Sequence, residues 1–401
     1  LVGSEMCIRD SVMAFLANKP FALAPGMGLN SFFAIVVSNI VSITGLSYTE
    51  SFQAGLCIIL IEGIIFFILS VLNVREKIVQ AIPLGVRLGI APAIGLMLMN
   101  IGFGSNAGIY SDKGGPFYVM RDFFGSLTPG LARDTMGSGY SAMVLAVVTM
   151  FIGLFVIIIL AHKKVKGAVL LGMLASCVIY WAGEAIFLDT NPFASLKGAS
   201  FVPPFADMAD TTLFKFNFSG FVEIGWFTAI SLIITFCIID MFDTIGTLIG
   251  VSSKANMLDK NGKLPRIKGA LMADAVATCA GAVLGTSTTT TFVESASGVS
   301  EGGRTGLTAV TTAILFGLAL FLSPIFLAIP SFATAPALIV VGFYMLTNVV
   351  NIDFSDLSEA IPCYICIGAM PFFYSISEGI AMGVISYVAI QIPVSYTHLR
   401  A

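Results

Sequence analysis

Two short stretches place acidic side chains in apolar surroundings. Residues 285–298 read GTSTTTTFVESASG, a run of hydroxyl groups with a single carboxylate, Glu294. Roughly forty residues earlier, Asp240 and Asp243 stand three positions apart, and therefore on one face of a helix. An ionised carboxylate at the centre of a bilayer costs roughly 2.5 to 3.5 kcal/mol, so acids at that depth usually line a water-filled cavity or a substrate path. These residue types therefore point to transport.

The composition indicates that the surrounding elements are membrane helices. Of the 401 residues, 57% are hydrophobic and 11% are charged, against about 25% charged in an ordinary soluble domain. A spanning helix needs about 20 mostly apolar residues, and no period-2 alternation of a closed barrel is visible. We therefore predict an all-α polytopic protein embedded in the lipid bilayer. Clear spans are 52–72, 84–103, 141–161, 168–188, 221–251, 269–284, 307–329 and 333–348, and weaker or broken ones are 21–43, 292–300, 362–374 and 379–392.

The remaining polar residues give an orientation and exclude other classes. If the turn at Lys19 is cytoplasmic and the spans alternate, most Lys and Arg residues fall on that side, as the positive-inside rule requires. The formal net charge of −3 and the lack of a basic patch argue against nucleic-acid binding. The seven cysteines lie mostly in apolar runs, which favours packing over disulfides or metal ligation. An intramembrane enzyme would need a nucleophile with a base, or a metal cluster, and the sequence offers neither.

Two of the apolar stretches are interrupted in a related way. Pro25, Gly26 and Gly28 forbid a continuous helix over 21–33, so this stretch begins extended and becomes helical from Leu29. Residues 285–291 contain a β-branched threonine run that also favours extended backbone, and a helical stretch starts at Phe292. Paired half-helices of this kind mark transporter sites, because irregular backbone at membrane depth must be buried or line a cavity. The alternative is a pair of ordinary loops at the membrane surface.

Three motifs carry a resemblance to a known family. Residues 18–34 (NKPFALAPGMGLNSFFA), 240–250 (DMFDTIGTLIG) and 273–308, which include the threonine run and Glu294, resemble the AzgA-like hypoxanthine/adenine/guanine permeases. These belong to the nucleobase:cation symporters of the xanthine/uracil permease family, in the nucleobase-ascorbate transporter superfamily. The resemblance extends over 12–392. It implies proton-coupled uptake of purine bases (adenine, guanine and hypoxanthine) across the cytoplasmic, or inner, membrane.

The resemblance also implies a uracil-permease-like architecture. That fold has fourteen membrane segments in two inverted repeats of seven, and its third and tenth segments each begin with a short strand. On this chain the core domain would be 11–73 with 221–329, and the gate domain 84–188 with 333–393, while 189–220 forms an extracellular loop. Residues 1–10 and 394–401 resemble translated adaptor sequence, so we expect them to be non-native tails on a fragment that lacks the first segment and the end of the last. Relatives of this fold often pair through the gate domain, which leaves a homodimer open.

Family members bind the base between the two half-helices and the eighth segment. Carried over by motif, this nominates Asn30, Asp240, Asp243 and Glu294, with the backbone at Thr289 and Thr290 close by. Carboxylates accept the N–H groups of a flat purine, and an amide both donates and accepts. Phe292 is one of several phenylalanines able to stack on the ring. For Asp240 the alternative is a carboxyl that braces a neighbouring helix.

Coupling to protons is expected from the same carboxyl groups. No Lys or Arg stands at comparable depth in the sequence, and burial without a positive partner favours the protonated form. We therefore expect Glu294 or Asp243 to carry the proton, with the proton gradient as energy source and no cofactor or metal. Asp274 and Glu62 are secondary candidates that could equally brace the helices. An anion or other small-solute transporter on the same fold is the alternative function, and the acids at 243 and 294 argue against it.

Overall fold

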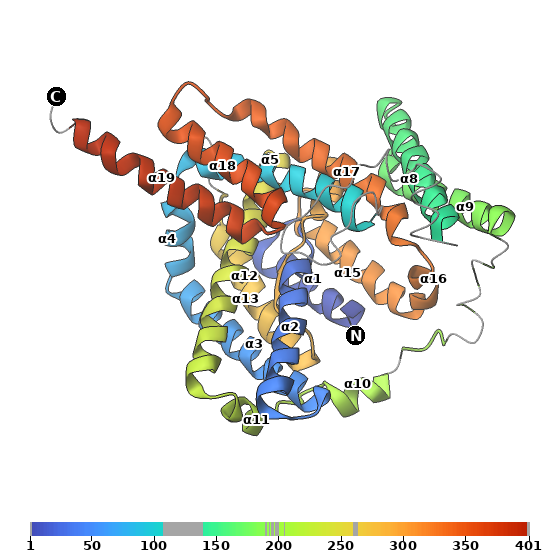
Figure 1. The fold of residues 1–401 in the computed structure, drawn as a ribbon, viewed down its shortest axis with the longest axis horizontal. Helices are drawn as coiled ribbons and strands as arrows, with labels where there is room; N and C mark the ends of the chain where they lie inside the picture. The colour runs from blue at the N-terminus through green and yellow to red at the C-terminus, as the bar shows by residue number, and fades with distance from the viewer. Residues whose placement is uncertain are drawn as a thin grey trace.

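The protein is mostly helical (Figure 1), and the computed structural model describes residues 2–106, 139–188, 191, 193, 196, 200–203, 205–259 and 264–398. Within these residues, eight helices are long and apolar enough to cross a membrane. The prediction of a multi-pass helical membrane protein is thereby confirmed. The eight spans are Tyr48–Val71, Leu84–Gly104, Val144–His162, Ala168–Phe187, Trp226–Lys254, Ile267–Leu284, Phe332–Asn351 and Ile376–Pro393.

The described elements follow one another along the chain in this order. The first part of the chain contains α1 (Val2–Ala17), β1 (Leu23–Pro25), α2 (Met27–Thr44), α3 (Tyr48–Val71), α4 (Val74–Ala81), α5 (Leu84–Ile101) and the π-helical turn η1 (Gly102–Asn106). The middle contains α8 (Gly139–His162), α9 (Ala168–Phe187), α10 (Phe205–Thr211), α11 (Phe218–Glu223), α12 (Trp226–Lys254) and α13 (Ile267–Leu284). The last part contains β2 (Thr289–Thr291), α14 (Ser295–Ser300), α15 (Gly306–Phe321), α16 (Ser323–Leu327), α17 (Ser331–Leu346), η3 (Thr347–Asn351), α18 (Leu357–Phe373) and α19 (Ile376–His398).

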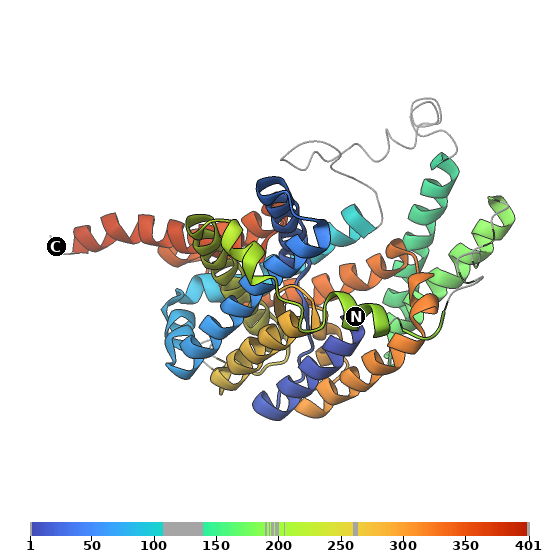
Figure 2. The ribbon, with the colours of Figure 1, turned by 90° about the horizontal axis from the view of Figure 1, so that it is seen from below.

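The helices pack as two groups that meet along α12. In the first helix group, α1 packs against α13 and α15, and α3 packs against α2 and α13. In the second helix group, α5 packs against α17 and α18, α18 packs against α19, and α8 packs against α9 and α17. Figures 1 and 2 show α8 and α9 side by side at one end of the molecule and α19 reaching out at the other. Because α12 contacts α3 as well as α5 and α19, its acids lie at the junction of the groups.

Three expected spans differ from the structure. The run 307–329 is not one helix: α15 ends at Phe321 and α16 follows with Pro324 in its first turn, where the missing N–H is tolerated. The run 221–251 is divided at Gly225, whose φ of 88° is accessible to glycine. The run 379–392, expected to be weak or broken, lies instead within the continuous helix α19 despite Pro393. Tertiary packing, which hydropathy does not record, decides these breaks.

Residues 2–10, expected to belong to an appended tail, form the first half of α1. Arg9 and Asp10 are buried, and Asp10 Oδ1 accepts a hydrogen bond of 2.6 Å from the backbone N–H of Leu23. The non-native origin of this segment stays a prediction. In the structure its last residue, Asp10, contacts β1 itself.

The two interrupted stretches pair with each other. β1 and β2 form an antiparallel two-stranded sheet in the register Leu23↔Thr291, Ala24↔Thr290 and Pro25↔Thr289. Each strand leads into a helix, α2 after β1 and α14 after β2, although α2 begins at Met27 and not at Leu29, and α14 begins at Ser295 and not at Phe292. Thr289, Thr290 and Thr291 are at most 5% exposed. The predicted change from extended to helical backbone is therefore confirmed at both places, and the alternative of surface loops is wrong.

The close approach of the strands depends on Gly26. A Cβ atom at this position would lie 2.6 Å from Cγ2 of Thr290, although the backbone itself, at φ −60°, is open to any residue. We predict that Gly26→Ala destabilises the protein by about 1 to 3 kcal/mol through overpacking. Adding Thr290→Ser, which removes the obstructing methyl group, should restore most of the loss in a thermal unfolding measurement.

Gly298→Ala in α14 is the matched control, because a Cβ there meets nothing within 4 Å. If Gly26→Ala melts like the wild type, the tight strand contact does not limit stability.

Candidate functional site

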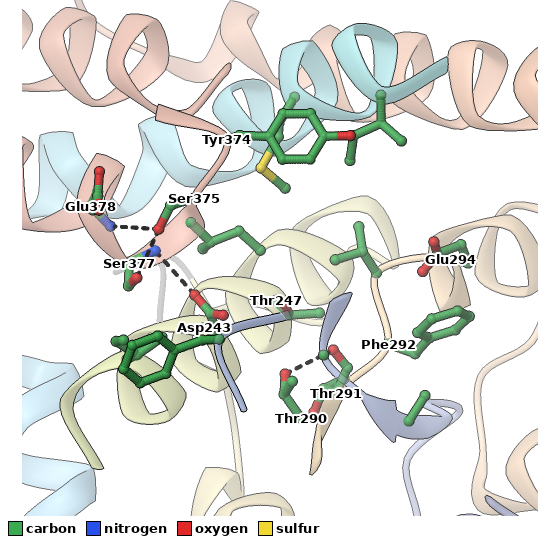
Figure 3. Close-up of a pocket in the computed structure, with 18 residues that line it drawn as sticks. Asp243, Thr247, Thr290, Thr291, Phe292, Glu294, Tyr374, Ser375, Ser377 and Glu378 are labelled. Atoms are coloured by element: carbon green, nitrogen blue, oxygen red, sulfur yellow. Dashed lines mark hydrogen bonds between the residues drawn. The ribbon is translucent and has the colours of Figure 1, made fainter. Parts of the chain in front are cut away.

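A cavity of about 330 Å³ lies between the two helix groups. The first group lines it from α12, from both strands and from the turn after β2, and the second group lines it from α5 and from the turn between α18 and α19. Figure 3 shows polar side chains of both groups around this space. Its polar lining residues are Asp243, Thr247, Thr290, Thr291, Glu294, Tyr374, Ser375, Ser377 and Glu378.

Asp243 reaches across the cavity from α12 to α19. Its Oδ1 accepts a hydrogen bond of 3.1 Å from the backbone N–H of Ser377, in the first turn of α19 (Figure 3). The helix N-terminus favours a negative charge at this position. The hydroxyls of Ser375 and Ser377 lie 2.9 Å apart, and Ser375 Oγ accepts from the N–H of Glu378 at 3.3 Å. Asp243 thus links the two helix groups directly.

The residues 374–378 are a part of the site that sequence reasoning missed. They form the connection between α18 and α19, and Tyr374 adopts a left-handed backbone with φ 56°, which is uncommon for a residue other than glycine. The available signal was the short polar sequence SISE between two apolar runs. It was not distinctive, because an ordinary turn between membrane helices reads the same way.

Glu294 and Phe292 lie on the turn between β2 and α14 and face the cavity (Figure 3). This turn is fixed by two bonds to Ala22, just before β1: the N–H of Phe292 donates to Ala22 O at 2.8 Å, and the N–H of Ala22 donates to Ser295 Oγ at 3.0 Å. The pairing of distant segments therefore positions Glu294. The cavity combines two half-buried carboxylates, Asp243 and Glu294, with hydroxyl and aromatic side chains.

Asp240 lies elsewhere, in a second, fully buried polar cluster. Thr244 Oγ1 lies 3.3 Å from Asp240 Oδ1 and 3.1 Å from Asp274 Oδ1, and Asp274 forms a salt bridge of 2.8 Å with Arg75. Glu62 joins from α3, where its Oε2 accepts from Thr288 Oγ1 at 2.6 Å. These three acids are 0% exposed and do not line the cavity.

The position of Arg75 shows that one expectation from the sequence is wrong. No positive side chain was expected at the depth of the acids, yet Arg75 is 0% exposed, stacks over the ring of Phe66 at 4.1 Å and donates to Leu271 O as well as to Asp274. The helix α4 that carries it folds back against α3 and α13. Arg75 stands between the expected spans 52–72 and 84–103, and hydropathy does not show that its guanidinium turns inward.

Asn30 and Thr289, also predicted at the site, are adjacent to the cavity without lining it. Asn30 is exposed, its Oδ1 accepts from Ser287 Oγ at 3.1 Å, and it lines a separate cavity of about 220 Å³. Thr289 is 0% exposed and is paired with Pro25 in the sheet. The structure therefore brings Asp243, Glu294, Thr290 and Phe292 together, and it does not bring Asn30, Thr289, Asp240, Asp274 or Glu62 into the same space.

Comparison with known proteins places these observations in context. Residues 10–382 match the model of the xanthine/uracil permeases, described as a permease family. The guanine/hypoxanthine permease PbuO of Bacillus subtilis (strain 168) is 35% identical over 94% of this chain and 80% of its own length. The adenine permease AdeP of Escherichia coli (strain K12) is 36% identical over 95% of this chain and 76% of its own length. The guanine/hypoxanthine permease PbuG of Bacillus subtilis (strain 168) is 36% identical over 96% of this chain and 78% of its own length.

The Arg75–Asp274 pair makes a testable contribution to stability. Removing one member of a buried ion pair leaves an uncompensated charge and typically lowers the free energy of unfolding by about 3 to 5 kcal/mol. We predict a loss of that order for Asp274→Leu, and a smaller loss for the double variant Arg75→Met/Asp274→Leu, measured by thermal unfolding in detergent.

Lys77→Met on the same helix is the control, since Lys77 is exposed and its replacement should change stability by less than about 0.5 kcal/mol. Equal stability of Asp274→Leu and the wild type would show that the pair does not brace the fold.

Proposed function

Because the chain belongs to the xanthine/uracil permease family, we propose that it carries purine nucleobases across the cytoplasmic membrane. The family and the candidate membrane spans make it a transporter and not an enzyme. Adenine, guanine and hypoxanthine are the proposed substrates, following the names of the relatives. The observation that carries the proposal is the cavity at the junction of the two helix groups, with Asp243 and Glu294 in its lining.

The chemistry of this cavity suits a small, flat heterocycle. A volume of about 330 Å³ lies at the lower end of the range for small-molecule sites. Asp243 and Glu294 can each accept N–H groups from the edge of a purine, and charge-assisted hydrogen bonds of this kind give geometric selectivity. Phe32 and Phe292 line the same cavity and offer apolar faces for the ring. A simple anion would instead meet two negative groups.

The other predicted residues enter the proposal as positioning residues. Asn30 bonds to Ser287 in the segment before β2, Thr289 pairs with β1, and Asp240 belongs to the buried cluster that reaches Thr288 through Glu62. The contacts of Asn30, Thr289 and Glu62 hold the segment that leads to Thr290 and Glu294, whereas Asp240 is bonded to Thr244 in its own helix. Their removal would therefore act on substrate binding through the shape of the cavity.

Proton coupling is proposed for Asp243 or Glu294, with Asp274 and Glu62 as secondary candidates. Both first-choice carboxyls line a cavity bounded by two helix groups. A protonated Asp243 would be a weaker acceptor for the N–H of Ser377, so proton binding would loosen a direct link between α12 and α19. This couples protonation to relative movement of the groups.

The proposed movement is of elevator type, with 11–73 and 221–329 as core and 84–188 and 333–393 as gate. The division of contacts between the two helix groups supports these boundaries. The antiparallel pairing of two strand-and-helix units supports an inverted 7+7 repeat. A homodimer that pairs through the gate belongs to the same proposal.

The site is tested by conservative substitutions of its acids. Glu294→Gln and Asp243→Asn keep the shape but lose the charge that strengthens hydrogen bonds to the base. Such bonds contribute about 1.5 to 3 kcal/mol, so we expect hypoxanthine uptake to fall about tenfold or more at subsaturating substrate. Uptake of labelled hypoxanthine into cells is the measurement, with immunoblots of the membrane fraction to verify insertion.

Glu223→Gln on the exposed side of α11 is the matched control and should transport normally. Adenine and guanine should compete with the labelled base more strongly than uracil does. Undiminished uptake by Glu294→Gln would remove Glu294 from the site, and stronger competition by uracil would contradict the purine assignment.

The coupling ion is tested separately in proteoliposomes. An inward proton gradient should drive accumulation of hypoxanthine above equilibrium, and a protonophore should abolish it, because the carboxyl that binds the base must also take up the proton. A sodium gradient at equal pH should drive none. Accumulation that survives the protonophore would exclude proton symport while leaving purine binding intact.

A further inference from the structure

A second polar cavity lies away from the purine site, at the ends of three membrane spans. It has a volume of about 450 Å³ and is lined by the turn after α8, the end of α12, the end of α14 and α17. The candidate spans that end or begin here are Val144–His162, Ala168–Phe187 and Trp226–Lys254. The cavity therefore lies where membrane helices meet the headgroup region of the bilayer.

The charged side chains of this cavity are mostly basic. Its lining contains Lys164, Lys166, Lys254 and Arg304 against one acid, Glu301. Glu301 Oε2 accepts from the N–H of Gly167 at 3.2 Å, so the acid is engaged by the turn between α8 and α9. Four cations around one cavity with a single acid make a site for an anionic group.

Two of the four basic side chains, Arg304 and Lys254, are held in place by contacts with neighbouring groups of the protein. Arg304 Nη1 donates to Val299 O at 2.6 Å and to Gly303 O at 2.7 Å. Lys254 Nζ lies 4.7 Å from the ring centre of Tyr344. These contacts hold two of the cations that line the cavity, one at the end of α12 and one in the segment after α14.

An apolar cavity of about 610 Å³ continues from the basic one. The two share the lining residues Ala161 and Tyr344. From Ala161 the apolar wall follows α8 through Ile158 to Leu154, seven residues or about 10 Å along the helix axis. Ile158, Met99 and Phe343 on this wall are 39–59% exposed, as expected for side chains that face lipid.

We propose that these joined cavities form a binding site for an anionic phospholipid, with the phosphate among the lysines and Arg304 and one acyl chain along α8. The basic end alone would accept free phosphate, but only a lipid uses the apolar continuation as well. The turn at 163–166 falls on the side expected to be cytoplasmic, where anionic lipids attract basic residues. Because the lining comes from α8 and α17 as well as from α12 and α14, a bound lipid would bridge the two helix groups.

The test uses the full chain, purified in detergent and depleted of lipid. Native mass spectrometry titrated with dioleoylphosphatidylglycerol and dioleoylphosphatidylcholine measures how many molecules bind and how tightly. We expect one molecule of phosphatidylglycerol to bind tightly and phosphatidylcholine to bind more weakly. The double variant Lys166→Gln/Arg304→Gln should lower the affinity for phosphatidylglycerol about 25-fold. This is about fivefold for each cation removed, which corresponds to about 1 kcal/mol of binding free energy per basic side chain.

Two further variants keep the test decisive. Lys268→Gln removes an exposed lysine at the start of α13, outside both cavities, and should leave binding unchanged. Ile158→Trp fills part of the apolar cavity and should weaken the binding of phosphatidylglycerol while leaving the cations in place. Each variant is first compared with the wild type by thermal unfolding without lipid, so that a folding defect is separated from a binding defect.

Three outcomes would overturn the proposal. These are equal binding of the two lipids, no effect of Lys166→Gln/Arg304→Gln, and full displacement of phosphatidylglycerol by millimolar inorganic phosphate together with no effect of Ile158→Trp. The last of these would assign the basic cavity to a free anion. All readouts are independent of purine binding.

Discussion

The pairing of β1 with β2 is the constraint on which the rest of this structure depends. At membrane depth each unsatisfied backbone group costs several kcal/mol, so extended segments survive only where their N–H and C=O groups find protein partners. Here two segments separated by more than 260 residues satisfy one another across a short antiparallel ladder. Because neither strand is stable alone, Thr290 and Glu294 take their positions only when Leu23–Pro25 is in place. The cavity is therefore a product of this contact.

The two acids of helix α12, Asp240 and Asp243, have different surroundings. Asp240 and Asp243 are three residues apart, which turns them about 60° from one another around the helix axis. That rotation is enough to place Asp243 in the cavity against α19 and Asp240 in the buried cluster with Thr244 and Asp274. Asp243 lines the cavity and contacts the second helix group, whereas Asp240 lies in the buried cluster of the first group.

The cavity lined by Asp243 and Glu294 and the basic cavity beside Arg304 both lie where the two helix groups meet. The junction is formed by α12, which packs against α5 and α19 through buried apolar side chains such as Ile90, Ile245 and Ile380, and by polar bonds such as that of Asp243 with Ser377. The proposed substrate and the proposed lipid would both act at this junction.

The sequence by itself determined the membrane class, most of the spans and the two extended breaks, and it nominated the acids Asp243 and Glu294 that line one cavity. Each of these follows from local properties: run length, proline and glycine positions, threonine content and the cost of a charge in lipid. Only the tertiary structure decided which acids share a space, that Arg75 is buried beside Asp274, and that Tyr374 to Glu378 close the cavity. The physical reason is that those contacts join residues far apart in the chain, where direction and depth depend on how helices pack and not on the residues that form them.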